Sequence, residues 1–140
     1  MLNAGNPIGV MDSGIGGLTV VRELQRILPG EDIIYFGDSA NCPYGNKTSD
    51  QIFELSSHML QFLGDNGVKC TAIACNTIST MADRLRPDAV IVVDALACAE
   101  PDRLGCTVQL TDTGITPGSG VGNDRAGLDR TTLGVPVAAI

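Results

Sequence analysis

Short apolar runs with the composition of β-strands alternate along this chain with segments that have the 3.6-residue periodicity of α-helices. The first run, 8–11, is continuously apolar, as expected for a strand that is covered on both faces. A glycine-rich turn follows it, and then 18–28, in which apolar residues recur at helical spacing. The alternation is repeated several times and predicts an α/β fold with a mainly parallel sheet.

The other expected elements rest on signals of the same kind. Thr48 and Gln51 have the spacing of a capping box and open a long helix. Asn76 or Thr77 is expected to cap a helix that runs to Arg86. The predicted strands are 8–11, 33–36, 70–75, 89–93, 107–110 and 135–140, and the predicted helices are 18–28, 48–64, 77–86, 95–104 and 124–132.

The composition limits the class of protein. With 140 residues, 44% of them hydrophobic and 18% charged, the chain is long enough to bury one core and lies outside the disordered regime. Its net charge of −7 argues against nucleic acid and against an anionic membrane as partners. Every apolar run is too short to span a bilayer, and 1–7 lacks the features of a secretory signal. We therefore expect a cytoplasmic protein.

The spacing of the five cysteines is not that of a disulfide framework or of a metal site. No two of them form a Cys-x-x-Cys pair, so neither a disulfide framework nor a metal site is expected. Cys75 is expected between a strand and a helix N-terminus, where free N–H groups favour a thiolate, although buried cysteines more often serve only as small apolar residues. The other four are assigned to packing; they are Cys42, Cys70, Cys98 and Cys106.

Three polar clusters follow the ends of predicted strands. They are Asp12-Ser13 with its glycine-rich turn, Pro43-Tyr44-Gly45, and Cys75-Asn76-Thr77. The carboxyl ends of parallel strands share one edge of the sheet, where ligands bind. The glycines of the first cluster would let backbone N–H groups approach an anion, but a tight turn between strand and helix needs glycine with or without a ligand. Both interpretations stay open on this evidence.

At these clusters the sequence resembles the glutamate racemases of the aspartate/glutamate racemase superfamily. The resemblance lies within 7–83, in the stretches IGVMDSGIGGLTVVRELQRILPGEDIIYFGDSANCPYGNK and GVKCTAIACNTIST. It implies an enzyme that uses no cofactor and holds the substrate α-carbon between two cysteines from two similar domains. Cys75 would be one of these catalytic thiols, and Asp12 would lie near the acid/base groups. The residues implied to bind the substrate are Asp12, Ser13, Pro43, Tyr44, Gly45, Asn76 and Thr77.

The second half of this machinery is missing from the sequence. The motif that would supply the second thiol, a cysteine followed by threonine and histidine, does not occur in 84–140. One thiol can exchange a proton on one face of the α-carbon, but it does not efficiently invert the centre. Complete racemisation is therefore not expected of these residues.

From Pro87 onward a different pattern begins, in the stretches PDAVIVVDALA, TVQLTDTGITPGSGVGNDRAGL and TLGVPVAAI. Over 87–140 it resembles the germination proteases, which degrade small acid-soluble spore proteins. The resemblance implies that Asp94 is one of two carboxylates of an aspartic-type peptide hydrolysis, in which two carboxyl groups share a proton. The partner carboxylate lies in the N-terminal part of that family, which this chain has replaced. The loop 113–123 would be either a crossover connection or an anion cradle.

We therefore interpret the chain as a chimera of a racemase-like segment, 7–83, and a protease-like segment, 87–140, within a single domain that spans 1–140. The resemblances imply a three-layer α/β/α sandwich, flavodoxin-like in its N-terminal half and phosphorylase/hydrolase-like in its C-terminal half. The sheet is expected to be mixed and six-stranded. In it, 107–110 is antiparallel, and 135–140 lies between that strand and the fourth one.

Three hypotheses of function follow. The leading one is a domain with no complete active site and no native enzymatic activity. The alternative is a residual binder of a small amino acid or anion, with proton exchange at Cys75. The third and weaker one is peptide hydrolysis by Asp94 and a second carboxylate, for which Asp12 and Asp38 are candidates along the same edge. We expect a monomer or a weak homodimer.

Overall fold

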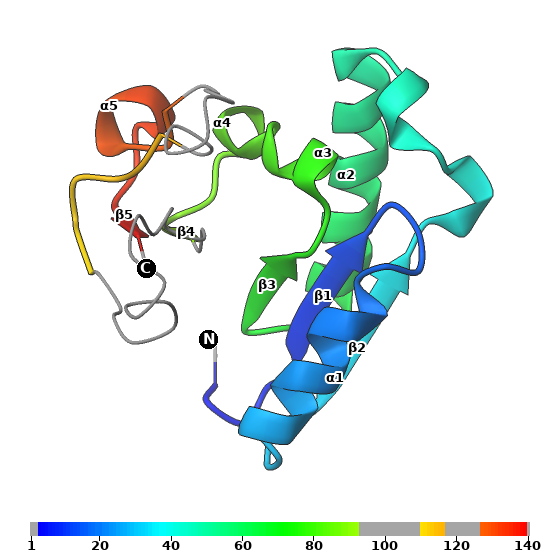
Figure 1. The fold of residues 1–140 in the computed structure, drawn as a ribbon. Helices are drawn as coiled ribbons and strands as arrows, with labels where there is room; N and C mark the ends of the chain where they lie inside the picture. The colour runs from blue at the N-terminus through cyan, green and yellow to red at the C-terminus, as the bar shows by residue number, and fades with distance from the viewer. Residues whose placement is uncertain (1–2, 93–109, 117–126, 140) are drawn as a thin grey trace, which may run out of the picture. The chain divides into compact units, whose positions relative to one another are not determined.

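The computed structural model describes residues 3–92, 110–116 and 127–139. The chain divides into two compact units, an N-terminal unit, Met1–Leu85, and a C-terminal unit, Arg86–Ile140 (Figure 1). Each is described by itself below, and the single domain over 1–140 stays a prediction. Within the described residues, no helix is both long and apolar enough to cross a membrane.

The N-terminal unit is built on a parallel sheet of three strands in the order β2-β1-β3. They are β1 (Ile8–Asp12), β2 (Ile33–Gly37) and β3 (Cys70–Ile73). Ile8 is in register with Ile33 on one side and with Cys70 on the other. The central strand is buried along its whole length, as its unbroken apolar sequence predicts. The predicted α/β class and parallel pairing are confirmed for this unit.

Helices lie on both faces of this sheet, α1 (Leu18–Ile27) in front of it and α2 (Ser49–Asp65) behind it in Figure 1. Successive strand residues point to opposite faces. The β1 face that carries Met11 joins α2 in the main core. That core consists of Met11, Tyr44, Ile52, Met59, Leu63, Cys75, Ile78 and Met81. The predicted capping box of α2 is present, since the Thr48 and Gln51 side chains each accept from the other's backbone N–H.

The apolar stripe of α1 is less covered than its periodicity predicts. None of its residues is fully buried; Val21 and Leu24 are half-buried. Leu18 is 49% and Ile27 is 56% exposed. Helical periodicity therefore identifies the helix here but overstates how much of its apolar face is buried.

The helix predicted over 77–86 is broken, and the prediction of one continuous helix is wrong. The structure has two single turns instead, α3 (Asn76–Ser79) and α4 (Ala82–Leu85), and Cys75 is the N-cap of the first. The hydroxyl of Thr80 donates to the carbonyl oxygen of Thr77 at 2.7 Å. The backbone N–H of Met81 donates to the carbonyl oxygen of Ile78 at 2.9 Å, a three-residue step in place of the four-residue step of an α-helix.

The C-terminal unit contains the parallel pair β4 (Val90–Val92) and β5 (Val137–Ala139). Ala139 also forms an antiparallel bridge with Thr111. Both strands begin later than the predicted 89–93 and 135–140, whose last residues lie outside the described residues. Leu110, the described residue of the predicted strand 107–110, is not in a strand, and the rest of that strand lies outside the described residues.

Of the helix predicted over 124–132, the described residues form only the single turn α5 (Arg130–Leu133), which Asp129 caps. The Asp129 carboxylate accepts from the backbone N–H groups of Thr131 and Thr132, at 2.7 and 2.8 Å. An N-cap residue lies outside the helix, so the described residues 127–129 are not helical. The predicted helix 95–104 and most of the loop 113–123 lie outside the described residues.

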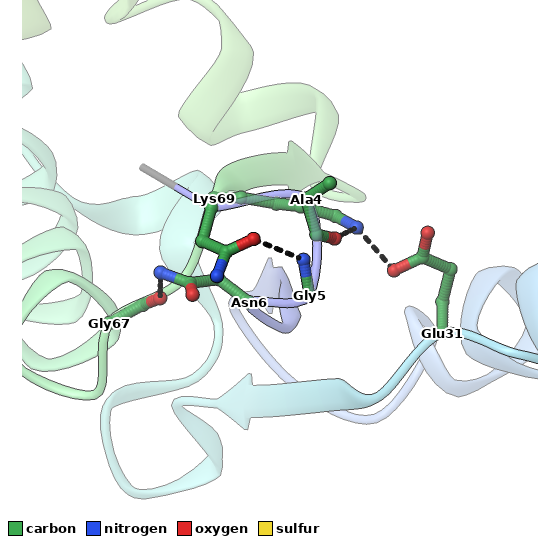
Figure 2. Close-up of polar contacts among 7 residues, drawn as sticks. Ala4, Gly5, Asn6, Glu31, Gly67 and Lys69 are labelled. Carbon is green, nitrogen blue, oxygen red and sulfur yellow. Dashed lines mark hydrogen bonds and ion pairs between the residues drawn. The ribbon is translucent and has the colours of Figure 1, made fainter. Parts of the chain in front are cut away.

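The start of the chain is tied to the N-terminal ends of the strands by Lys69 (Figure 2). Its ammonium donates to the carbonyl oxygen of Ala4 at 2.6 Å and pairs with the carboxylate of Glu31. The side-chain amide of Asn6 donates to the carbonyl oxygen of Gly67 at 2.9 Å. These contacts lie at the edge of the sheet opposite to the ends of β1 and β3 that carry the polar clusters.

We expect Lys69→Met to lower the free energy of unfolding by about 1 kcal/mol, because it removes a partly buried ion pair and a charge-assisted hydrogen bond. The matched control is Arg26→Met. Its ion pair with Glu23 is well exposed, at 71% and 51%, and should contribute less than about 0.5 kcal/mol. Urea denaturation of both variants measures the difference. Equal losses would contradict the structural role given to Lys69.

Candidate functional site

The turn after β1 is closed by the carboxylate of Asp12, which is 7% exposed. One carboxylate oxygen accepts from the backbone N–H of Ser13 at 2.8 Å. The other accepts from the backbone N–H of Gly17, the N-cap of α1, at 2.7 Å. Asp12 therefore fixes the whole turn 12–17 and places Ser13 at the carboxyl edge of the sheet.

Two glycines in this region are required by close contacts. A Cβ on Gly17 would lie 2.9 Å from the Cβ of Asp12. A Cβ on Gly37, at the end of β2, would lie 2.3 Å from the carbonyl oxygen of Gly14. That carbonyl also accepts from the hydroxyl of Tyr35 at 2.6 Å. The end of β2 thus packs directly against the turn, and the glycines are explained by packing without a ligand.

Cys75 lies beside this turn. It follows β3, is 8% exposed and packs in the main core. Its thiol donates to the hydroxyl oxygen of Ser13 at 3.3 Å between Sγ and Oγ. The backbone N–H of Ala74 donates to the carbonyl oxygen of Met11 at 2.9 Å, which holds the two strand ends together. The structure therefore brings together Asp12, Ser13 and Cys75 from two neighbouring strand ends.

Tyr44 is buried, 2% exposed, and packs in the same core as Cys75. Its hydroxyl donates to the carboxylate of Asp38 at 2.7 Å. Burial raises the pKa of Tyr44 well above its ordinary value, and the hydrogen bond and charge of Asp38 raise it further. The neighbouring Pro43 and Gly45 are exposed. Tyr44 thus anchors the Pro43–Gly45 segment to the core, and the phenol stays protonated as a donor.

This pKa makes stability depend on pH in a definite direction. Below the ordinary tyrosine pKa of 10.0, Tyr44 is protonated in both folded and unfolded chains. Above it, the unfolded chain loses the proton while the folded chain keeps it, so the free energy of unfolding falls as pH rises. Burial, and secondarily the charge of Asp12, raises the pKa of Tyr35 in the same direction. Together these are the two tyrosines of the chain.

We therefore expect Tyr44→Phe to reduce the loss of stability between about pH 9 and pH 11, since each titrating group contributes up to about 1.4 kcal/mol per pH unit. Urea denaturation across this range measures the slope, with Tyr35→Phe as the matched variant that leaves Tyr44 in place. A Tyr44→Phe protein with the full wild-type slope would contradict the buried, hydrogen-bonded phenol.

The remaining predicted site residues are less closely joined to this group. Thr77 is half-buried in α3, and the side chain of Asn76 is not described. Asp94 lies outside the described residues, so its role stays a prediction. Within the described ranges, no three His, Cys, Asp or Glu side chains are placed to hold a metal ion.

Two cysteines assigned to packing are exposed, which corrects that assignment. Cys70 begins β3, an edge strand of the three-stranded sheet that the described residues form. Cys42 lies in the loop after β2, and its Sγ is 3.6 Å from the position that a Cβ on Gly14 would take. A short apolar side chain in a strand or loop thus does not by itself predict burial.

Asp38, named above only as a candidate carboxylate for peptide hydrolysis, lies beside the racemase-like residues instead. It is 9% exposed, and its backbone N–H donates to the carbonyl oxygen of Asp12 at 3.0 Å. Its sequence signal was available: Asp38 follows the end of β2 as Asp12 ends β1. The hydrogen bonds to Tyr44 and Asn41 depend on a loop conformation that the sequence pattern does not specify.

Together, the fold and this site define the N-terminal unit as a parallel α/β domain with a polar edge, formed by a glycine-rich turn and a thiol at neighbouring strand ends. The family is shown by a match over residues 54–140 to the family model described as germination protease. The chain belongs to that family. The match begins within α2, upstream of the position near Pro87 where the protease-like pattern is expected to start.

The chain is also similar to glutamate racemases. It is 51% identical over 76 residues to the enzyme of Bifidobacterium adolescentis, which is 54% of this chain and 30% of the relative. With the enzyme of Clostridium novyi the identity is 53% over 76 residues, which is 54% of this chain and 29% of the relative. The chain thus spans less than a third of the length of these relatives. Its similarities point to two protein families, germination protease and glutamate racemase.

Solved structures extend the second similarity to the fold. The crystal structure of glutamate racemase from Francisella tularensis in complex with D-glutamate matches with a TM-score of 0.52 and 42% identity, over 65% of this chain and 43% of that one. The enzyme of Thermus thermophilus in complex with beta-chloro-D-alanine has a TM-score of 0.52 and 34% identity, over 64% of this chain and 43% of that one.

Proposed function

We propose that this chain is a recombined α/β protein that binds a small amino acid or its carboxylate at the turn 12–17, beside Cys75, without completing the reaction of either related family. The observation that carries the proposal is the 3.3 Å contact between the Cys75 thiol and the Ser13 hydroxyl. It places a thiol and a hydroxyl, which can donate and accept protons, at the carboxyl edge of the parallel sheet, where ligands of α/β domains bind. The similarity to a racemase solved with D-glutamate supports this ligand class.

The chemistry expected of this arrangement is proton exchange on one face of the ligand. A Cys75 thiolate would remove the proton from the α-carbon and return a solvent-derived proton to the same face. Inversion needs a second acid on the opposite face. The Cys-Thr-His motif that would supply it does not occur in 84–140. These 140 residues should therefore exchange the α-proton and leave the configuration unchanged.

Ligand binding is tested by titrating ¹⁵N-labelled protein with L-glutamate and D-glutamate and following the backbone amide signals. We expect shifts at 12–17 and 75–77 at millimolar ligand. Ser13→Ala should weaken binding, whereas Thr19→Ala, whose exposed hydroxyl bonds the carbonyl oxygen of Gly16, is the matched control. Unchanged amide signals with both enantiomers would contradict the proposed site.

A second candidate function is peptide hydrolysis, which membership in the germination protease family favours. It would use Asp94 together with a second carboxylate that shares its proton. Cleavage of acid-soluble spore protein by the purified chain, lost in Asp94→Asn, would support this function. Absence of cleavage by the wild-type protein would leave the ligand-binding proposal as the better account.

The finer features of the fold belong to this proposal. A mixed sheet is supported by the parallel pair β4–β5 together with the antiparallel bridge between Thr111 and Ala139. The three-layer, six-stranded sandwich with flavodoxin-like and phosphorylase/hydrolase-like halves is proposed on the two resemblances. We also propose a cytoplasmic protein, monomeric or weakly dimeric. Its net charge of −7 disfavours nucleic acid and anionic membranes as partners.

A further inference from the structure

The carboxylate of Asp38 makes hydrogen bonds that take no part in closing the turn 12–17 or in the proposed proton exchange. It accepts from the side-chain amide of Asn41, with nitrogen–oxygen distances of 2.9 and 3.0 Å to its two oxygens. One of these oxygens also accepts from the Tyr44 hydroxyl at 2.7 Å. The backbone N–H of Asp38 donates to the carbonyl oxygen of Asp12 at 3.0 Å. The Asp38 carboxylate therefore holds two side chains of one loop, and its backbone, fixed to the end of β1, sets where that carboxylate lies.

These contacts connect all three segments of the candidate site. Asn41 and Tyr44 flank Pro43, so two side chains of the loop 39–46 converge on one carboxylate. The ring of Tyr44 packs in the core that also contains Cys75. Asp12, which receives the backbone hydrogen bond, is the residue that closes the ligand turn. A displacement of Asp38 would therefore be transmitted to both sides of the site.

We propose that Asp38 is a positioning residue, which holds the loop 39–46 against the turn 12–17 and so sets the affinity of the site for its amino-acid ligand. The effect on affinity rests on the function proposed above, whereas the positioning of the loop does not. The hydrogen bonds to an ionised carboxylate are stronger than neutral ones. Asparagine would keep one oxygen that can accept from the buried hydroxyl of Tyr44, but it would remove the charge that strengthens this hydrogen bond.

The test compares Asp38→Asn, which keeps the size and removes the charge, with Asp50→Asn. Asp50 is an exposed acid in the first turn of α2 whose carboxylate pairs with Arg84. In the free protein, Asp38→Asn should speed amide hydrogen exchange at 44–46 and lower the pH at which Tyr44 ionises, measured by tyrosinate absorbance in a Tyr35→Phe background. Asp50→Asn should change neither. With L-glutamate or D-glutamate, Asp38→Asn should raise Kd about tenfold.

The outcomes separate this inference from the function on which it rests. If the wild-type protein binds neither enantiomer, the proposed function fails, and the free-protein measurements still decide the role of Asp38. Hydrogen exchange and Tyr44 ionisation equal to wild type in Asp38→Asn would overturn the positioning role. If the wild type binds and Asp38→Asn binds equally well, the effect on affinity is overturned. Should Asp38→Asn fail to fold, Asn41→Ala removes two of the same contacts at an exposed position. This variant must then speed amide hydrogen exchange at 41–46, and unchanged exchange would overturn the positioning role.

Discussion

Replacing Gly37 with alanine is expected to lower the free energy of unfolding by about 3 kcal/mol, at the upper end of the usual cost of overpacking. The added Cβ would lie 2.3 Å from the carbonyl oxygen of Gly14 and 2.8 Å from the ring of Tyr35. The first of these atoms belongs to the backbone of the turn 12–17 and cannot move without moving the turn. The variant should therefore be less stable and also have displaced amide signals at 12–17.

The matched control is Gly30→Ala. A Cβ on Gly30 would meet no atom within 4 Å, and this glycine does not have a positive φ. Its replacement should leave stability unchanged or raise it by about 0.5 kcal/mol, because alanine lowers the conformational entropy of the unfolded chain. Urea denaturation and amide spectra of the two variants provide the comparison. A Gly37→Ala protein as stable as Gly30→Ala would contradict the packing of β2 against the turn.

Leu63→Ala is expected to cost about 3 kcal/mol of unfolding free energy, within the range for large-to-small changes in a core. Leu63 is 0% exposed, and its methyl groups lie against the backbone of β1, 3.1 and 3.3 Å from the position of a Cβ on Gly9. The truncation would leave a cavity between α2 and the central strand. The turn 12–17 is at the other end of β1, so its amide signals should change little.

The control for this variant is its neighbour in sequence. Phe62 is larger but 43% exposed, and its ring makes an edge contact with Phe36 at 5.1 Å between centroids. Phe62→Ala should cost about 1 kcal/mol, since it loses mainly a partly exposed aromatic pair. Thermal or urea unfolding gives both values. A larger loss for Phe62→Ala than for Leu63→Ala would show that the main core is placed wrongly.

The elements of the N-terminal unit could be predicted from sequence because their signals are local and agree with one another. The apolar run of β1, the Asp12 turn and the capping box of α2 each specify a local structure that packing then reinforces. The break between α3 and α4 could not be predicted in this way. There the backbone changes to a three-residue hydrogen bond from Met81 to Ile78, and no residue pattern in the sequence specifies that step.

The part of the candidate site that lies at strand ends could be predicted from the sequence, and the part that lies in a loop could not. Asp12, Ser13 and Cys75 are placed by strand ends, whose common edge follows from a parallel sheet. Tyr44 and Asp38 are placed by a loop instead. Their hydrogen bond sets the orientation of a buried phenol, and no periodicity in the sequence encodes it. The exposure of Cys42 has the same origin, because it too depends on the path of that loop.

The similarities to two families bear on function in different ways. The germination protease family covers 54–140, while glutamate racemase relatives match at about 50% identity over little more than half of the chain. The residues that the structure brings together are those of the racemase-like resemblance. We therefore place the proposed ligand at the turn 12–17 and treat peptide hydrolysis as the second candidate.

The most direct test of this account follows L-glutamate and D-glutamate separately in D₂O with purified protein. Proton NMR measures loss of the α-proton signal, and chiral chromatography measures conversion between the enantiomers. We predict that the α-proton exchanges for deuterium without conversion, that Cys75→Ala abolishes the exchange, and that Cys70→Ala, at the opposite end of β3, preserves it. Interconversion of the enantiomers that Cys75→Ala abolishes would contradict exchange without inversion, and absence of any exchange would contradict the reactive role of Cys75.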